Sequence, residues 1–158
     1  MLVIADASPV IVLVNTGYVE VLPRLFGRVI VPPEVMDELG RPNRPAAVRE
    51  FMSRRPDWME VRAPAAASSI ANLHAGETAA IQLATELRAD LLLIDEVQGR
   101  RLAAERHIRL TGTVGVLELA ATQGLLDLRE AFDRVRQTDF WISPALLDAR
   151  LTAFLRGK

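Results

Sequence analysis

The stretch "ADLLLIDEVQGRR" (residues 89–101) decides how the chain is expected to fold. Four apolar residues, 91–94, form a run typical of a buried strand, and this run ends directly on Asp95 and Glu96. Arg100 and Arg101 follow about one helical turn later. A buried strand that ends on two carboxylates and leads into a basic helix indicates a site at the carboxyl edge of a parallel sheet.

The rest of the sequence alternates between strand and helix patterns. Strands are expected at 2–6, 28–31, 58–63, 91–94 and 108–112, and helices at 8–17, 18–26, 32–40, 44–55, 76–87, 96–106, 113–126, 129–137 and 143–155. Strands that alternate with helices are joined by right-handed crossovers, so the sequence predicts an α/β fold with a central, mainly parallel sheet. Residues 64–72 predict a surface connection.

Length and composition narrow the class of protein. The 158 residues are expected to form a single domain, 1–158, with an aliphatic core, because 50% are hydrophobic and only 5% aromatic. A net charge of −1 argues against binding nucleic acid by bulk charge alone. The absence of cysteine excludes disulfides and thiolate metal sites. No secretory signal or long apolar stretch is found, so a cytoplasmic protein without a membrane partner is expected.

Four carboxylates are expected near the carboxyl edge of the sheet. Asp6 ends the first strand, and Asp95 ends the apolar run quoted above. Glu77 lies three residues before the apolar Ala80, so it points inward from the first turn of its helix. Glu38 leans inward from the last turn of its helix, where a negative charge opposes the helix dipole. These acids would repel one another unless a cation joins them.

A divalent cation is the economical partner for this set, since the only lysine of the chain is Lys158. Oxygen ligands without cysteine suit Mg²⁺ or Mn²⁺. Other chemistries of strand ends are excluded: there is no P-loop motif, and the D-x-D of aspartyl-phosphate phosphatases is replaced by Asp6-Ala7-Ser8. Metal-dependent hydrolysis of a phosphodiester remains.

Each acid also has a purely structural interpretation. Asp95 and Gln98 fit a D-x-x-Q capping box, and Asp6 can cap the first helix, although Ser8 is also placed to do so. Glu77 fits the ordinary preference for acids in a first turn, and Glu38 can simply be solvated.

Several other residues are interpreted as structural at this point. These are the two histidines, His74 and His107, and the two tryptophans, Trp58 and Trp141, which are expected to anchor packing. Glu34 can take the place of Glu38.

Five stretches, in order, resemble the PIN-domain proteins and in particular their VapC-like branch. They are "VIADAS" (3–8), "VPPEVMDEL" (31–39), "GETAAIQLA" (76–84), "LLLIDEVQGRRLA" (91–103) and "LTGTVGVLELA" (110–120). The resemblance covers nearly the whole chain. It implies a three-layer α/β/α sandwich and an Mg²⁺- or Mn²⁺-dependent ribonuclease specific for single-stranded RNA. It also implies that the chain is the toxin of a toxin–antitoxin pair.

The resemblance assigns roles to individual residues. It implies a catalytic quartet with supporting polar residues and an additional metal ligand: Asp6, Glu38, Glu77 and Asp95, then Ser8 and Thr113, then Glu96. The metal ligands expected from this set are Asp6, Glu77, Asp95 and Glu96. Independently of the resemblance, Arg100 and Arg101 are placed to steer the RNA backbone. The two arginines are alternatively solvated charges.

Two other classes of function stay open, together with the assembly. The chain can be a catalytically silent PIN-like module that binds nucleic acid or protein, or a structural subunit built around its C-terminal helices. Those helices, 129–156, either pack on the domain or form an interface. Leu147, Leu151 and Phe154 repeat at i, i+4 and i+7, and a homodimer and an antitoxin partner are expected.

Overall fold

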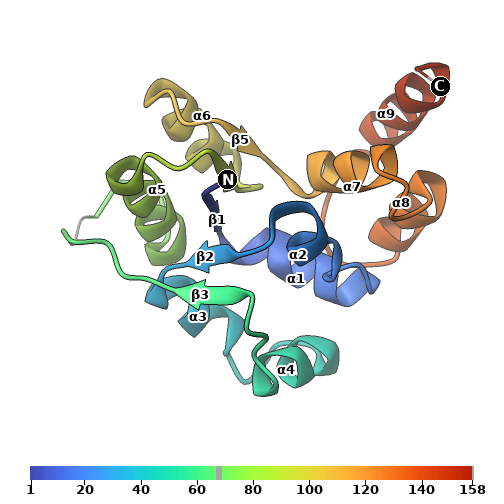
Figure 1. Cartoon of the computed structure of the whole chain (residues 1–158). Coiled ribbons are helices and arrows are strands. Elements are labelled where there is room, and N and C mark those ends of the chain that lie inside the picture. Colours follow the sequence, from blue (N-terminus) through green and yellow to red (C-terminus); the bar gives the residue numbers. More distant parts are fainter. Residues whose placement is uncertain (67–68, 158) are drawn as a thin grey trace.

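The computed structural model describes residues 1–66 and 69–157. Within them lies one five-stranded sheet with the order β3-β2-β1-β4-β5, in which every pairing is parallel (Figure 1). The strands are β1 (Val3–Ala5), β2 (Val29–Val31), β3 (Met59–Val61), β4 (Leu91–Leu93) and β5 (Leu110–Thr111). This order places β3 at an edge, as its alternating sequence suggests.

Helices connect the strands and complete the chain. They are α1 (Ala7–Thr16), α2 (Val21–Phe26), α3 (Pro33–Leu39), α4 (Ala46–Ser53), α5 (Ala75–Leu87), α6 (Val97–Glu105), α7 (Thr113–Thr122), α8 (Leu128–Arg136) and α9 (Pro144–Arg156). Every predicted helix is present, although α7 ends four residues before the predicted end at 126. Residues 67 and 68 of the predicted connection 64–72, and Lys158, lie outside the described residues.

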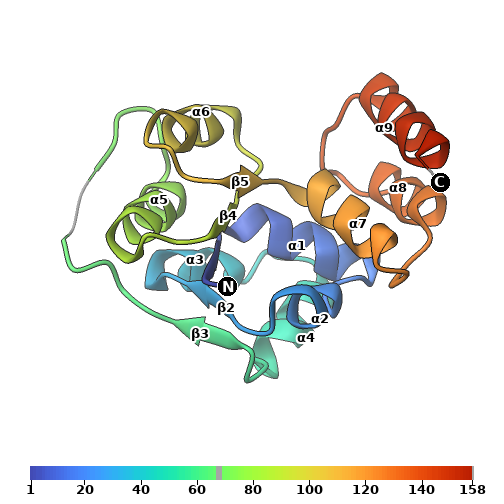
Figure 2. The same cartoon turned by 45° about the horizontal axis from the view of Figure 1, so that its top comes forward.

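The sheet is the middle of three layers, because successive side chains of each strand point to opposite faces. Val3 and Ala5 join a core that α1, α3 and α7 help to form. Ile4, between them, joins a second core formed with α5 and α6. Figure 2 shows α5 and α6 together on one side of the molecule and α7, α8 and α9 on the other. The predicted three-layer α/β/α sandwich is therefore confirmed.

Two of the N-caps that the sequence suggests, Ser8 and Asp95, are wrong. The N-cap of α1 is Asp6, so Ser8 lies inside the helix and its predicted capping role is wrong. Pro23 lies in the first turn of α2 and does not break it, because first-turn amides have no partner within the helix. The N-cap of α6 is Glu96, one residue later than the predicted cap Asp95.

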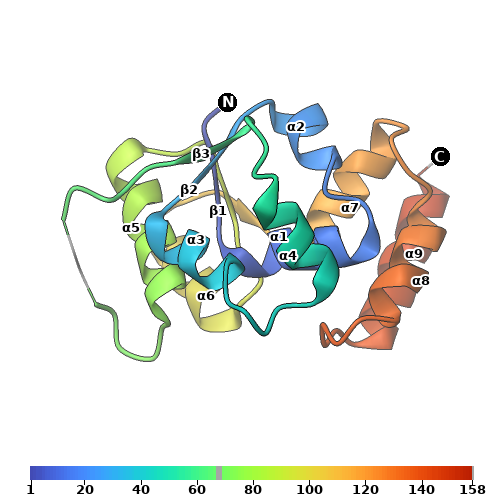
Figure 3. The ribbon, with the colours of Figure 1, turned by 90° about the horizontal axis from the view of Figure 1, so that it is seen from below.

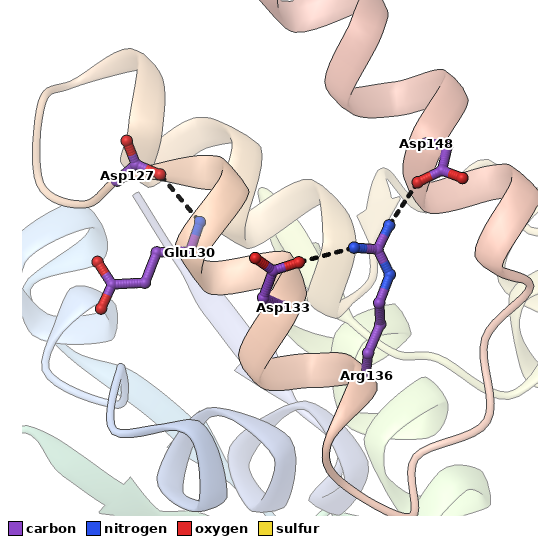
Figure 4. Close-up of polar contacts among 5 residues, drawn as sticks. All are labelled: Asp127, Glu130, Asp133, Arg136 and Asp148. Carbon is purple, nitrogen blue, oxygen red and sulfur yellow. Dashed lines mark hydrogen bonds and ion pairs between the residues drawn. The ribbon is translucent and has the colours of Figure 1, made fainter.

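The C-terminal helices pack on the domain. Leu147 and Leu151 are buried in the larger core, and Phe154 packs against it. Arg136 of α8 donates to Asp133 in its own helix and to Asp148 of α9, at 2.8 and 2.6 Å (Figure 4). Figure 3 shows the two helices side by side. The apolar stripe of α9 is thus largely used within the chain.

Across residues 1–66 and 69–157, none of the helices combines the length and the apolar character needed to cross a bilayer.

Candidate active site

Asp6 and Asp95 follow neighbouring strands at the carboxyl edge of the sheet. The register pairs Ala5 of β1 with Leu93 of β4, so the two strands end at the same level of the sheet. The amide of Asp6 donates to the carbonyl of Leu93 at 2.9 Å, which extends this pairing by one residue. Both predicted strand-end acids therefore emerge at the edge where parallel α/β sheets bind their ligands.

Asp6 is the most perturbed acid of the site. It is only 3% exposed, and its Oδ1 is buried with no hydrogen-bond partner. Burial raises the pKa of Asp6 to about 7, partly offset by the amide of Ala7 and reinforced by the charges of Glu38, Glu77 and Asp95. The four predicted acids thus interact electrostatically around one buried carboxyl group, and a buried oxygen without a partner calls for an explanation.

Glu38 is held against the start of α5. Its Oε1 accepts a hydrogen bond from the amide of Gly76 at 3.2 Å. A Cβ atom at Gly76 would overlap the Glu38 carboxylate, so glycine at this position lets that carboxylate reach the start of α5. Glu34, the predicted substitute for Glu38, is not among the charges that act on Asp6.

Glu77 is buried beside the same helix start. It is 8% exposed, and its Oε2 accepts from the amide of His74 at 3.2 Å, so it does serve the first turn of α5. Burial raises the pKa of Glu77, and the charges of Glu96 and Glu38 raise it further. Its inward position is confirmed, and the local capping contact accounts for only one of its oxygens.

Asp95 is held by donors from distant parts of the chain. Its Oδ1 accepts from the Thr113 amide at 2.7 Å, and its Oδ2 accepts from the hydroxyls of Thr113 at 2.7 Å and Ser8 at 3.1 Å. The capping-box interpretation of Asp95 is therefore wrong. Ser8 and Thr113, the predicted supporting residues, fix the orientation of this carboxylate.

The neighbours of Asp95 on α6 have local roles as well. Glu96 caps α6, because its Oε2 accepts from the Gly99 amide at 2.7 Å. Arg100 donates from Nη1 to the carbonyl of Ile94 at 3.0 Å and is partly buried, whereas Arg101 is exposed. Of the two arginines predicted to contact RNA, Arg101 is the one that faces solvent.

The donor set suits a hard divalent cation. In the described part of the chain, no three His, Asp or Glu side chains form a ready-made metal site. Mg²⁺ commonly binds through only one or two carboxylates and keeps several waters, so a complete protein cage is not required. The unpartnered buried oxygen of Asp6, with two or more carboxylates around it, fits the chemistry of Mg²⁺ or Mn²⁺.

A comparison of the sequence with protein families gives a direct result. A family model described as a PIN domain matches residues 2–154. The chain belongs to the PIN-domain family. This assignment confirms the resemblance of the five sequence stretches to PIN-domain proteins and gives the chain a nuclease-type fold. No curated protein matches the sequence closely enough to name a substrate or partner for this PIN domain.

The sequence-based interpretation of Trp141 as a packing anchor of this PIN domain is wrong, because 83% of Trp141 is exposed. It lines a groove that Asp95 also lines. Trp58 does pack as predicted, with its ring 6.2 Å from that of Phe51. Trp58 opens the strand expected at 58–63, whereas Trp141 lies in the connection between the helices expected at 129–137 and 143–155.

Proposed function

We propose that this PIN-domain protein is an Mg²⁺- or Mn²⁺-dependent endoribonuclease that cleaves single-stranded RNA. The observation that supports this most strongly is Asp6, a buried carboxyl with an unpartnered oxygen and a pKa of about 7, surrounded by three further acids. Such a group destabilises the folded chain unless a ligand compensates it, so its presence favours a function over a structural role.

In this proposal Asp6, Glu77 and Asp95 hold the cation, with Glu96 beside Glu77. A bound divalent cation supplies positive charge that neutralises the scissile phosphate and lowers the pKa of water. Ser8 and Thr113 keep Asp95 in one orientation through their hydrogen bonds.

Glu38 completes the acidic surroundings from α3. Its carboxylate accepts a hydrogen bond from the Gly76 amide. It acts on Asp6 through its charge. Arg101, which is exposed, attracts the RNA backbone toward the site, as basic side chains do for any polyphosphate.

The test uses a long single-stranded RNA, incubated with Mn²⁺ or with EDTA. Wild type is expected to cleave only with Mn²⁺, and Asp6→Asn to lose at least about a hundredfold in rate, the usual scale for removing a group that stabilises transition-state charge. Asp133→Asn is the matched control, since Asp133 lies in α8 and pairs with Arg136. Equal cleavage by Asp6→Asn would place the activity elsewhere.

The same experiment separates the enzyme from a silent binding module. A wild-type protein that retards RNA in a gel, but leaves it intact with every divalent cation, is a module. Double-stranded RNA and single-stranded DNA of equal length are included, and both are expected to survive conditions that degrade single-stranded RNA.

We also propose that the protein acts in the cytoplasm as the toxin of a toxin–antitoxin pair. Induced expression is then expected to arrest growth, and Asp6→Asn to abolish the arrest. A small neighbouring gene for a DNA-binding protein, whose product copurifies with this chain and restores growth, would support the pairing. Continued growth with active wild-type protein would contradict it.

We still propose a homodimer, but not through the apolar stripe of α9 that suggested it. Leu147 and Leu151, which suggested it, are buried within the chain itself, so a dimer would need another surface. Light scattering at high protein concentration measures the assembly, and a mass of one chain would refute it.

A further inference from the structure

A groove extends from the acidic edge of the sheet to the C-terminal segment. It has a volume of about 430 Å³. Asp95, Arg100 and Gly112 line it together with Trp141, Ile142 and Leu146. Gly112 leaves room beside the first two, because a Cβ there would lie 2.6 Å from Asp95 Oδ1 and 2.7 Å from Arg100 Nη1.

Exposed apolar side chains gather on this groove. Trp141 is 83% exposed, Val97 69% and Leu146 47%, and all three line it. They come from three separate parts of the chain: the start of α6, the segment before α9, and α9 itself. Exposed apolar surface gathered at one place, and rimmed by polar groups, marks a binding surface.

The shape and position of the groove favour a nucleobase as its occupant. Its volume lies in the range of small-ligand sites. An indole ring offers a flat face on which any base can stack. The groove shares Asp95 with the proposed catalytic site, so a base held there belongs to a nucleotide whose phosphate lies close to the acids.

Charge along the groove agrees with this occupant. Arg100 uses Nη1 for the carbonyl of Ile94, which fixes a guanidinium group beside the path of a phosphate backbone. Arg150, which also lines the groove, is bound to both carboxylate oxygens of Glu118 and is neutralised there. Arg100 is therefore the cation of the groove that lies beside Asp95, since both side chains approach Gly112.

We propose that this groove is a nucleobase-binding subsite in which Trp141 stacks on a base of single-stranded RNA adjacent to the scissile phosphate. The proposal deepens the ribonuclease function and rests on it for the identity of the polymer. Trp141 is a binding residue that fixes the register of the RNA on the acids.

The test measures binding of a short oligouridine with Mn²⁺ present. All variants are made in the Asp6→Asn background, so that the RNA stays intact. Trp141→Ala is expected to weaken binding at least about fivefold, the low end of what one base–aromatic stack contributes. Trp141→Phe is expected to restore much of the loss, because phenylalanine also stacks. The control Leu155→Ala removes an exposed apolar side chain of α9 outside the groove and should leave binding unchanged.

Two further readouts identify the base as the occupant. The salt dependence of binding should be the same with and without Trp141, because stacking releases no counterions. The oligouridine should quench tryptophan fluorescence, and an abasic ribose-phosphate oligomer of equal length should not. Quenching that persists in Trp141→Phe, or equal quenching by both oligomers, would overturn the subsite.

The outcomes separate this proposal from the nuclease itself. If Mn²⁺-dependent cleavage is intact but Trp141→Ala binds and cleaves as wild type does, the subsite is wrong and the ribonuclease stands. If no cleavage occurs but Trp141→Ala loses stacking, the subsite stands on a binding module. If Trp141→Ala abolishes self-association or capture of a protein while RNA binding is unchanged, the groove is a protein interface and the subsite is wrong.

Discussion

Two acidic regions of this molecule treat their carboxylates in opposite ways. The first region is the pair of C-terminal helices, α8 and α9, called the hairpin below. There, Asp133 and Asp148 share Arg136 (Figure 4), and in α8 Glu130 pairs with Arg134 at 2.7 Å. At the sheet edge, Asp6 and Glu77 are buried, and among the described residues neither forms a salt bridge. The acids of the hairpin have arginine partners within the chain, whereas among the described residues those of the edge have hydrogen-bond donors at most and no salt bridge.

The difference teaches how to separate structural from functional acids. A carboxylate paired with arginine needs nothing more from solvent or ligand, whereas a buried carboxylate beside like charges makes the ionised fold less stable. Natural proteins retain such destabilising carboxylates where a bound ligand offsets the loss of stability. The comparison gives four predictions, from the largest expected effect to the smallest.

Stability without metal should fall as the pH rises. The pKa of Asp6 is about 7 in the folded state and near its ordinary value of 3.8 when unfolded. Between these values the folded state binds more protons, so stability is highest at acidic pH and is lost through the window from about 4 to 7, by up to roughly 4 kcal/mol. Urea unfolding in EDTA at several pH values measures this slope, and Asp6→Asn should flatten it and stabilise the protein at pH 8.

Asp95→Asn is the contrasting variant for that experiment. Asp95 accepts hydrogen bonds from Ser8 and Thr113, so an amide there presents a donor to groups that already donate. We expect it to destabilise by about 1 kcal/mol at pH 8, opposite in sign to Asp6→Asn. An unchanged pH slope in Asp6→Asn would contradict the assignment of the shift to that carboxyl.

Mn²⁺ should stabilise the sheet-edge region and not the hairpin. Wild type is expected to gain about 2.7 kcal/mol when free Mn²⁺ is a hundred times its dissociation constant, because the ion binds only the folded site. Asp6→Asn should lose most of this gain. Asp133→Asn, from the hairpin, should keep it. Thermal melts with EDTA and with Mn²⁺ measure all three proteins, and an unmoved wild-type midpoint would remove the metal from the mechanism.

Removing the ion pairs of Arg136 in the hairpin should have a smaller effect on stability. Arg136→Ala removes one ion pair within α8 and one between α8 and α9, and it is expected to destabilise by about 1 kcal/mol, since exposed pairs contribute little singly. Arg54→Ala is the matched control, because its pair with Glu50 is looser, at 3.6 Å, and highly exposed. Urea unfolding compares the two, and equal midpoints would mean that the tie across helices contributes nothing beyond a surface pair.

The smallest effect concerns RNA binding by Arg101, the exposed cation of α6. Arg101→Ala should weaken binding of all single-stranded RNA sequences alike and lower the salt slope by about 0.7, the value for one lost phosphate contact. Arg129→Ala, on the distant α8, is the control. Filter binding over a series of salt concentrations gives the slope, and an identical slope for both variants would make Arg101 a solvated charge.

The sequence by itself determined the fold class and the strand-end acids. Alternating strand and helix patterns report burial directly, so the parallel sheet, its edge strand β3 and the inward face of Glu77 follow from local periodicity. Asp6 and Asp95 follow from chain order alone, since parallel strands put their carboxyl ends on one edge.

Tertiary structure alone decided what each of these groups contacts. Glu96 rather than Asp95 caps α6, because Asp95 is drawn away by Thr113 and by Ser8, 87 positions earlier in the chain. Trp141 is exposed because its two neighbours, Phe140 and Ile142, pack against the core and leave Trp141 on the groove. A local pattern records which way a residue faces, but partners distant in sequence are chosen only when the crossovers bring strands and helices together.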